Sequence, residues 1–151
     1  SSAASDVYKR QCENRVDISG DPDDIKAFRK EAIKDGKFQF TNLIPRPVEL
    51  DIPSGYFGDS KKQKDMENKQ AENIKKYGHK DWYDWNCANW GTKWDVEASE
   101  GNPNDDELVQ LNFDTAWSPA EEVCNHIRDK FPNLDVTWFY DEPGMAFAGY
   151  L

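Results

Sequence analysis

The stretch WYDWNCANWGTKWD, residues 82–95, holds four of the six tryptophans of this 151-residue chain. Each tryptophan combines a large apolar ring with a single N–H donor, so a run this dense either nucleates a hydrophobic core or lines a pocket. Trp82 and Trp85 lie at helical spacing and are expected to pack in the core. The turn Trp90-Gly91-Thr92-Lys93-Trp94 is the part that we expect to carry a binding site.

On the N-terminal side of this stretch, the pattern predicts a strand, a helix and a second strand. Apolar and polar residues alternate over residues 12–18, which is typical of a half-buried strand. Asp21-Pro22 supplies the N-cap and the first residue of a helix, which is expected to end at Gly36. The second strand is predicted over residues 38–44 and ends at Pro45, since proline cannot donate to a sheet.

Residues 48–80 are predicted to form an insertion. The pattern is irregular as far as Gly58, where proline and glycine break it. Residues 60–76 are highly charged and have almost no apolar stripe, which indicates either a solvated helix with charge pairs four residues apart or a partly mobile segment. A basic patch at Lys61-Lys62 and Lys75-Lys76 is a sharper alternative, but acidic residues interleave with these lysines.

The C-terminal half predicts a short helix capped by Asp81 and then strands around a second helix. Ser118-Pro119-Ala120-Glu121 has the pattern of a capping box with proline at the first helical position, so that helix is expected to start at Ser118. The predicted strands cover residues 94–98, 108–115, 136–140 and 145–150, the last two joined as a hairpin. The predicted fold class is α+β: a ferredoxin-like antiparallel sheet with helices on one face and a charged helical insertion.

Composition excludes several classes of function. Twenty-nine acidic against 19 basic residues give a formal charge of −10, which argues against unspecific binding to nucleic acid or to an anionic membrane. The sequence has no run of ~18 apolar residues and no apolar signal region, so a cytoplasmic location is expected. Three widely spaced cysteines predict reduced thiols, and His79 and His126 are not at metal-binding spacing. We therefore expect no metal site, no cofactor and no catalytic residue.

Six ordered motifs carry a resemblance to a known family. They are Cys12-Glu13-Asn14-Arg15-Val16, Leu43-Ile44-Pro45-Arg46-Pro47, Trp82-Tyr83-Asp84-Trp85, Asn89-Trp90-Gly91-Thr92-Lys93-Trp94-Asp95, Thr115-Ala116-Trp117-Ser118-Pro119 and Tyr140-Asp141-Glu142-Pro143-Gly144-Met145. Over residues 12–151 the chain resembles the YubB-type ferredoxin-like domain family of phages and plasmids. The resemblance implies a ferredoxin-like sheet and an origin on mobile elements, and it names no biochemical role.

Residues 1–11 are treated separately because Asp6-Val7-Tyr8-Lys9-Arg10-Gln11 resembles a translated sequencing adapter. We expect this segment to be non-native or disordered, and residues 12–151 to form a single domain. A genuine N-terminal strand that ends at Tyr8 is the alternative. What precedes Cys12 or follows Leu151 in the natural chain is left open.

The predicted ligand site forms where the Gly91 turn meets the cap at Ser118. Its residues are Trp90, Gly91, Thr92, Lys93, Trp94, Trp117 and Ser118, with Arg15 and Arg46 as anion-binding candidates and Glu142 as a further contact. Tryptophan faces stack on nucleobases and helix N-termini attract phosphates, so this set predicts a nucleotide-like ligand. The alternative is that the tryptophans are core and the Lys93 stem covers them. Asp141-Glu142 is either an acid–base pair or an acidic turn.

Three functions are compatible with these patterns. The first is a non-catalytic counter-defence protein of a phage or mobile element that binds a nucleotide-type signalling molecule between tryptophans. The second is an acidic inhibitor or polyanion mimic that binds a basic host protein, for which the acid-rich residues 100–107 are candidates. The third is a nucleotide-processing enzyme, which would need a catalytic group that the sequence does not display.

Overall fold

The computed structural model describes residues 11–52, 58 and 60–151. The elements in chain order are β1 (Gln11–Ser19), α2 (Pro22–Ala32), β2 (Ile33–Lys34), β3 (Lys37–Phe38), α3 (Phe40–Leu43), the 3₁₀ helix η1 (Val48–Leu50), α4 (Ser60–Tyr77), α5 (Trp82–Asn89), β4 (Leu108–Ala116), α6 (Glu121–Lys130), β5 (Asp135–Glu142) and β6 (Phe147–Tyr150). Of the segment predicted to be non-native, residues 1–10 lie outside the described residues, and Gln11 begins β1.

Four strands form the main sheet in the order β4-β1-β5-β6, and all neighbouring pairs are antiparallel. β1 is central: Asn14 lies opposite Phe113 of β4 on one side and Tyr140 of β5 on the other. Helix α6 connects β4 to β5 across the intervening β1, which is a split βαβ arrangement. The predicted antiparallel α+β architecture is therefore confirmed.

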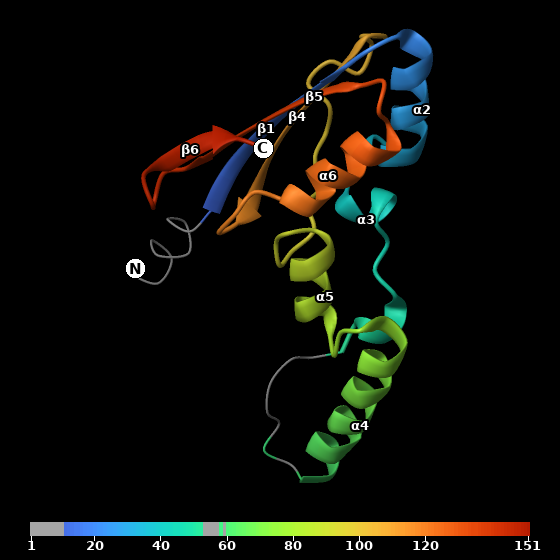
Figure 1. Ribbon diagram of the computed structural model, residues 1–151, viewed down its shortest axis with the longest axis vertical. Coiled ribbons are helices and arrows are strands. Elements are labelled where there is room, and N and C mark those ends of the chain that lie inside the picture. The colour runs from blue at the N-terminus through green and yellow to red at the C-terminus, as the bar shows by residue number, and fades with distance from the viewer. Residues whose placement is uncertain (1–10, 53–57, 59) are drawn as a thin grey trace.

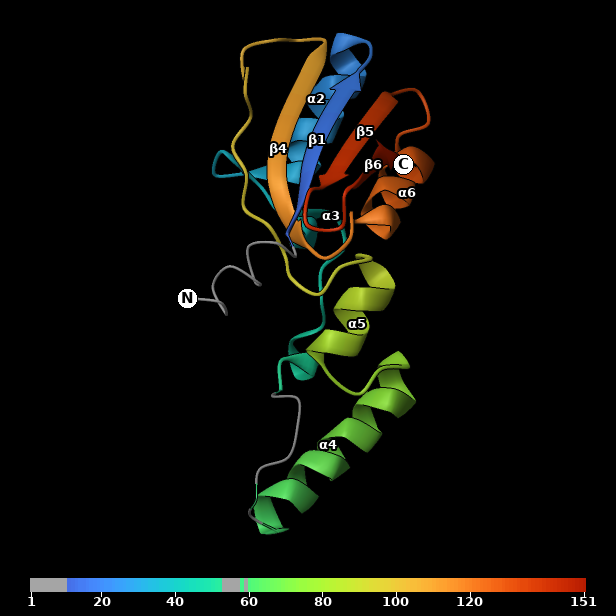
Figure 2. The ribbon, with the colours of Figure 1, turned by 90° about the vertical axis from the view of Figure 1, so that its left-hand side faces the viewer.

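The helices α2, α3 and α6 lie on one face of the sheet (Figure 1). Alternation along the strands explains the choice of face, because Cys12, Asn14 and Val16 of β1 are buried while Glu13 and Arg15 between them are exposed. Figure 2 shows the opposite face, and no helix of the described residues covers it. We call this the open face.

Helices α4 and α5 extend away from the sheet, with α4 farthest from it (Figures 1 and 2). Helix α4 confirms the predicted charged helical insertion and buries only Met66 and Asn73. The Asn73 side-chain amide donates to the carbonyls of Glu49 and Lys80, at 3.1 and 3.2 Å. These two bonds join α4 to the segments that flank it.

Three predictions for the segment from α2 to β4 are wrong. Helix α2 ends at Ala32, not Gly36, because residues 33–38 form a small hairpin that turns at Gly36, where φ is +76°. The strand predicted over 38–44 stops at Phe38, and α3 follows. The strand predicted over 94–98 is reduced to one bridge between Ala98 and Phe38. At the two predicted strands, 38–44 and 94–98, tertiary packing overrides a short apolar alternation.

Candidate functional site

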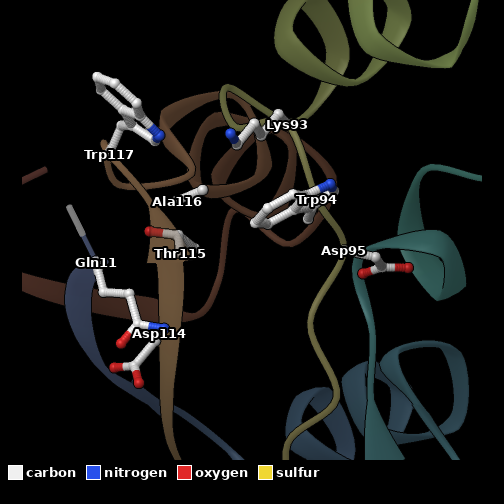
Figure 3. A pocket seen from close by; sticks show the side chains of 8 residues that line it. All are labelled: Gln11, Lys93, Trp94, Asp95, Asp114, Thr115, Ala116 and Trp117. Carbon is white, nitrogen blue, oxygen red and sulfur yellow. The ribbon is translucent and has the colours of Figure 1, made fainter. Parts of the chain in front are cut away.

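Lys93, Trp94 and Trp117 form a group that we call the aromatic clamp (Figure 3). The Lys93 Nζ lies 4.4 Å from the centre of the Trp94 ring and 5.6 Å from the centre of the Trp117 ring. Trp94 is 54% exposed and Trp117 is 52% exposed. Two large rings at the surface with a cation between them are an arrangement suited to binding a planar, anionic molecule.

Two hollows adjoin the clamp. The first, of about 190 Å³, is lined by Gln11, Lys93, Trp94, Asp95, Asp114, Thr115, Ala116 and Trp117. The second, of about 290 Å³, is lined by Tyr83, Cys87, Gly91, Thr92, Lys93, Ala116, Trp117 and Ser118. Whole-ligand pockets usually measure ~300–1,000 Å³, so the first hollow alone suits a single ring system. A larger ligand would extend past Lys93 and Trp117, which line both hollows.

The turn that carries Trp117 is held by three hydroxyl groups. Thr92 Oγ1 donates to the Ala116 carbonyl at 3.1 Å, Thr115 Oγ1 donates to the Ser118 carbonyl at 2.6 Å, and Ser118 Oγ donates to the Gly91 carbonyl at 3.0 Å. Within this turn Trp117 has a φ of +71°. The left-handed region is unfavourable for a bulky residue, so these hydrogen bonds maintain a strained backbone.

A buried network connects this turn to the core. The Trp138 indole N–H donates to Asn14 Oδ1 at 2.8 Å, and Asn14 Nδ2 donates to Thr115 Oγ1 at 2.9 Å. All three side chains are buried. The position of Trp117 is thus fixed by the centre of the sheet and not only by its own loop.

Gly91 packs against the first turn of α6. Its φ is +82°, and a Cβ at this position would lie 3.0 Å from the Glu121 nitrogen and 3.2 Å from the Glu122 nitrogen. The predicted capping box is therefore wrong: α6 begins at Glu121, and Ser118 bonds the Gly91 carbonyl instead of the helix. The N–H groups expected at the mouth of the site lie against Gly91, so they are not available to a ligand.

Trp90 was predicted at the site, but the structure places it in the core. It is 2% exposed, its indole N–H donates to the Ile44 carbonyl at 2.9 Å, and its ring packs against Phe40 and Trp85. Trp85 is core, as expected. Trp82 is only half-buried and lines a third hollow, described below.

The other predicted contacts are separated from one another. Arg15 lies on the open face of β1 and lines a hollow there. Glu142 is fully buried and accepts the Met145 backbone N–H, which is a structural role in the hairpin turn. Arg46 lines the third hollow, of about 280 Å³, together with Trp94. Of the two arginines, only Arg46 adjoins the clamp.

Asp95 is a structural residue that the sequence did not reveal. Its Oδ1 accepts the N–H groups of Phe40 and Val96, at 2.6 and 2.8 Å, and its Oδ2 accepts the Thr41 N–H at 3.2 Å. Asp95 thus caps α3 from a distant part of the chain, and its side chain points away from Lys93 in Figure 3. Burial raises its pKa despite these hydrogen bonds. No local pattern could reveal a cap 54 residues away.

The cysteines are poorly suited to nucleophilic chemistry. Burial raises the pKa of Cys12 to about 11, and burial is also the main cause of the raised pKa values of Cys87 and Cys124. Thiols of this kind stay protonated near neutral pH, and the thiolate is the reactive form.

The described part of the chain displays neither a metal-binding cluster nor a membrane-spanning helix. Among those residues, no three His, Cys, Asp or Glu side chains are placed to hold a metal ion. Nor is any helix there long and apolar enough to cross a membrane.

The C-terminal part of the chain matches the model of a known domain family. Residues 89–151 match a family described as a ferredoxin-like domain in Api92-like protein, and this segment contains the clamp, the strands β4–β6 and α6. No curated protein and no solved structure matches the chain. The sheet order and this match together show that the chain contains a ferredoxin-like α+β domain.

Proposed function

We propose that the protein is a non-catalytic binding protein whose aromatic clamp holds a nucleotide-type small molecule. The observation that carries this proposal is the pair of half-exposed tryptophans, Trp94 and Trp117, with Lys93 between them. The resemblance to the YubB-type family implies an origin on a mobile element, and in the expected cytoplasmic location the ligand would be a host signalling molecule. Sequestering it would serve counter-defence.

Interaction energies favour a base stacked on a clamp tryptophan over the Lys93 ammonium that contacts the rings in the structure. The Lys93 ammonium gains ~0.5–1 kcal/mol from an exposed aromatic ring, whereas a base stacked on a tryptophan gains ~1–3 kcal/mol. The flexible lysine stem can move aside and place its charge on a phosphate. A stacked base therefore interacts with the ring more strongly than the ammonium does, and Lys93 keeps a role as the phosphate contact.

The conformation of Trp117 supports the same proposal. A left-handed backbone costs a non-glycine residue ~1–2 kcal/mol, and strain of this kind clusters at functional sites. About half of the Trp117 ring is exposed, so a planar ligand can reach its face. A stacking site gives a reason for a large ring at this strained position.

Titration of tryptophan fluorescence with linear and cyclic nucleotides tests the proposal. We expect quenching and a higher melting temperature with at least one member of the panel, and loss of both in Trp94→Ala and in Trp117→Ala. Tyr150→Ala is the matched control, because Tyr150 is an exposed aromatic residue of the open face, at 70% exposure. A full panel without quenching or thermal shift would overturn the proposal.

A second candidate function rests on the open face. Glu13 lies directly opposite Asp114 in β4 and directly opposite Asp141 in β5, so three carboxylates form a row across three strands. Like charges opposite each other destabilise a sheet, and a basic partner would relieve the repulsion. This arrangement supports an acidic inhibitor of a basic host protein more than the 100–107 loop does, because Glu100 is already paired with Arg29 at 3.0 Å.

The second candidate predicts a complex that depends on salt. Immobilised protein should retain a basic host protein at low ionic strength and release it as salt screens the contact. The triple variant Glu13→Gln, Asp114→Asn and Asp141→Asn should fail to retain it, while Trp94→Ala should still do so. Equal retention by the triple variant would exclude the carboxylate row as the binding surface.

A further inference from the structure

Trp94 lines two hollows, the first hollow at the aromatic clamp and the third hollow beside Arg46. On the clamp side it is accompanied by Lys93 and Trp117. The third hollow, of about 280 Å³, places Trp94 beside Arg46 and Trp82. The clamp hollow thus combines Trp94 with Trp117 and one lysine, and the third hollow combines it with Trp82, the edge of the buried Trp90 and one arginine.

The Arg46 guanidinium is only weakly engaged by its acidic neighbour. Its Nη2 donates to Asp51 Oδ1 at 3.4 Å, and the Asp51 side chain is 69% exposed. An exposed ion pair of this length contributes little, so the guanidinium can exchange the Asp51 carboxylate for a phosphate. Its planar fork of donors also matches a phosphate better than a single lysine charge does.

One buried amide connects the two hollows. Asn86 is 1% exposed, its Nδ2 donates to the Lys93 carbonyl at 2.7 Å, and its Oδ1 accepts from Arg46 Nη1 at 3.4 Å. Asn86 belongs to α5, so the same helix positions the backbone of Lys93 and the head group of Arg46. The two hollows are therefore parts of one framework, not separate surface features.

We infer that the clamp and the Arg46 hollow together bind two adjacent bases of a short oligonucleotide, with the Trp94 ring between the bases. This inference rests on the proposed function and specifies its ligand class. Unstacked bases of single strands separate to accept aromatic side chains. Lys93 lines the first of these hollows and Arg46 the other, so each hollow offers one cationic side chain to a phosphate that flanks its base.

The charge of the protein limits the length of this ligand. Asp95 and Asp114 line the clamp hollow, Asp51 lines the Arg46 hollow, and the chain carries a formal charge of −10. Every further phosphate would extend into this acidic field and be repelled. The structure therefore favours a dinucleotide over a mononucleotide, and also over a long single strand.

Binding of three linear probes tests this inference: adenosine monophosphate, the dinucleotide pApA and oligoadenylate of ten residues. We expect pApA to bind at least about tenfold more tightly than the monophosphate, because a second base stacks. We expect the ten-residue probe to bind no more tightly than pApA at 0.15 M salt. Equal affinity for the monophosphate and pApA, or tighter binding of the longer probe, would overturn the inference.

Variants separate this inference from the proposed function. Arg46→Ala should weaken pApA binding by about tenfold and weaken monophosphate binding less, and Arg46→Lys should have a smaller effect on pApA. Arg15→Ala on the open face is the matched control, and melting temperatures establish that each variant folds. If Arg46→Ala folds and binds pApA like the wild type, the inference fails while the clamp stands. If no probe binds the wild type, the inference fails, and the full panel of linear and cyclic nucleotides decides the proposed function separately.

Discussion

Trp90 and Trp94 lie four residues apart around one turn, yet the first is 2% exposed and the second is 54% exposed. The difference arises from partners distant in sequence. The Ile44 carbonyl and the Phe40 ring, both at α3, receive Trp90, while Asp95 bonds the start of α3 and leaves Trp94 outside. Two tryptophans of one motif therefore lie in the core and at the surface, because contacts with α3 bury the first and not the second.

Truncating the two rings should give the largest difference. Trp90→Ala is expected to lower the free energy of unfolding by about 3–5 kcal/mol, because it leaves a cavity and an unpaired Ile44 carbonyl. Trp94→Ala should cost about 1 kcal/mol or less, because half of its ring is already in water. Urea denaturation followed by circular dichroism measures both. Equal losses would remove the distinction between core and clamp.

Gly91 separates the two tryptophans, and its replacement tests how tightly the turn packs on α6. Gly91→Ala should destabilise by about 2–4 kcal/mol, since the left-handed φ and the contact with Glu121 both oppose a Cβ. Gly36→Ala is the matched control: φ is +76° there, but no atom lies within 4 Å of the added Cβ. It should cost only about 1 kcal/mol. A similar cost at both positions would exclude close packing at Gly91.

On the clamp side, a smaller effect is expected at Trp117. Trp117→Gly should be more stable than Trp117→Ala by about 1 kcal/mol, because glycine tolerates a φ of +71° and alanine does not. Both variants should lose ligand-induced quenching. Thermal unfolding of the pair measures the strain directly, and an alanine variant as stable as the glycine variant would show that the turn is relaxed.

The smallest expected effect is a pH dependence of stability caused by Asp95, which follows Trp94 in the chain and caps α3. Burial raises its pKa above the usual 3.8, so the folded state holds this proton more tightly than the unfolded state. Its contribution to stability is therefore complete below pH 3.8 and is lost as the pH rises through the folded-state pKa. The stability of the wild type relative to Asp95→Asn should fall in urea denaturation as the pH rises above 3.8 and through the raised folded-state pKa of Asp95. A difference independent of pH would contradict this.

Much of the sheet could be predicted because its signals are local. β1, β4 and β5 each follow a period-two alternation, and α2 and α5 begin at the predicted caps. Predictions were wrong where the conformation of a segment depends on hydrogen bonds to residues distant in sequence. Residues 38–44 alternate like a strand but turn into α3 under the Asp95 cap, and Ser118 bonds Gly91 instead of capping α6.

The features of the candidate site also separate into those set by local sequence and those set by tertiary contacts. The sequence alone determined the aromatic run and the turn at Gly91, because residue type and turn chemistry are properties of short segments. The structure alone decided that Trp90 faces inward, that Arg46 and not Arg15 adjoins Trp94, and that Glu142 is buried. These outcomes depend on which buried N–H and carbonyl groups across the fold need partners, and that requirement can be met only once the sheet and helices are assembled.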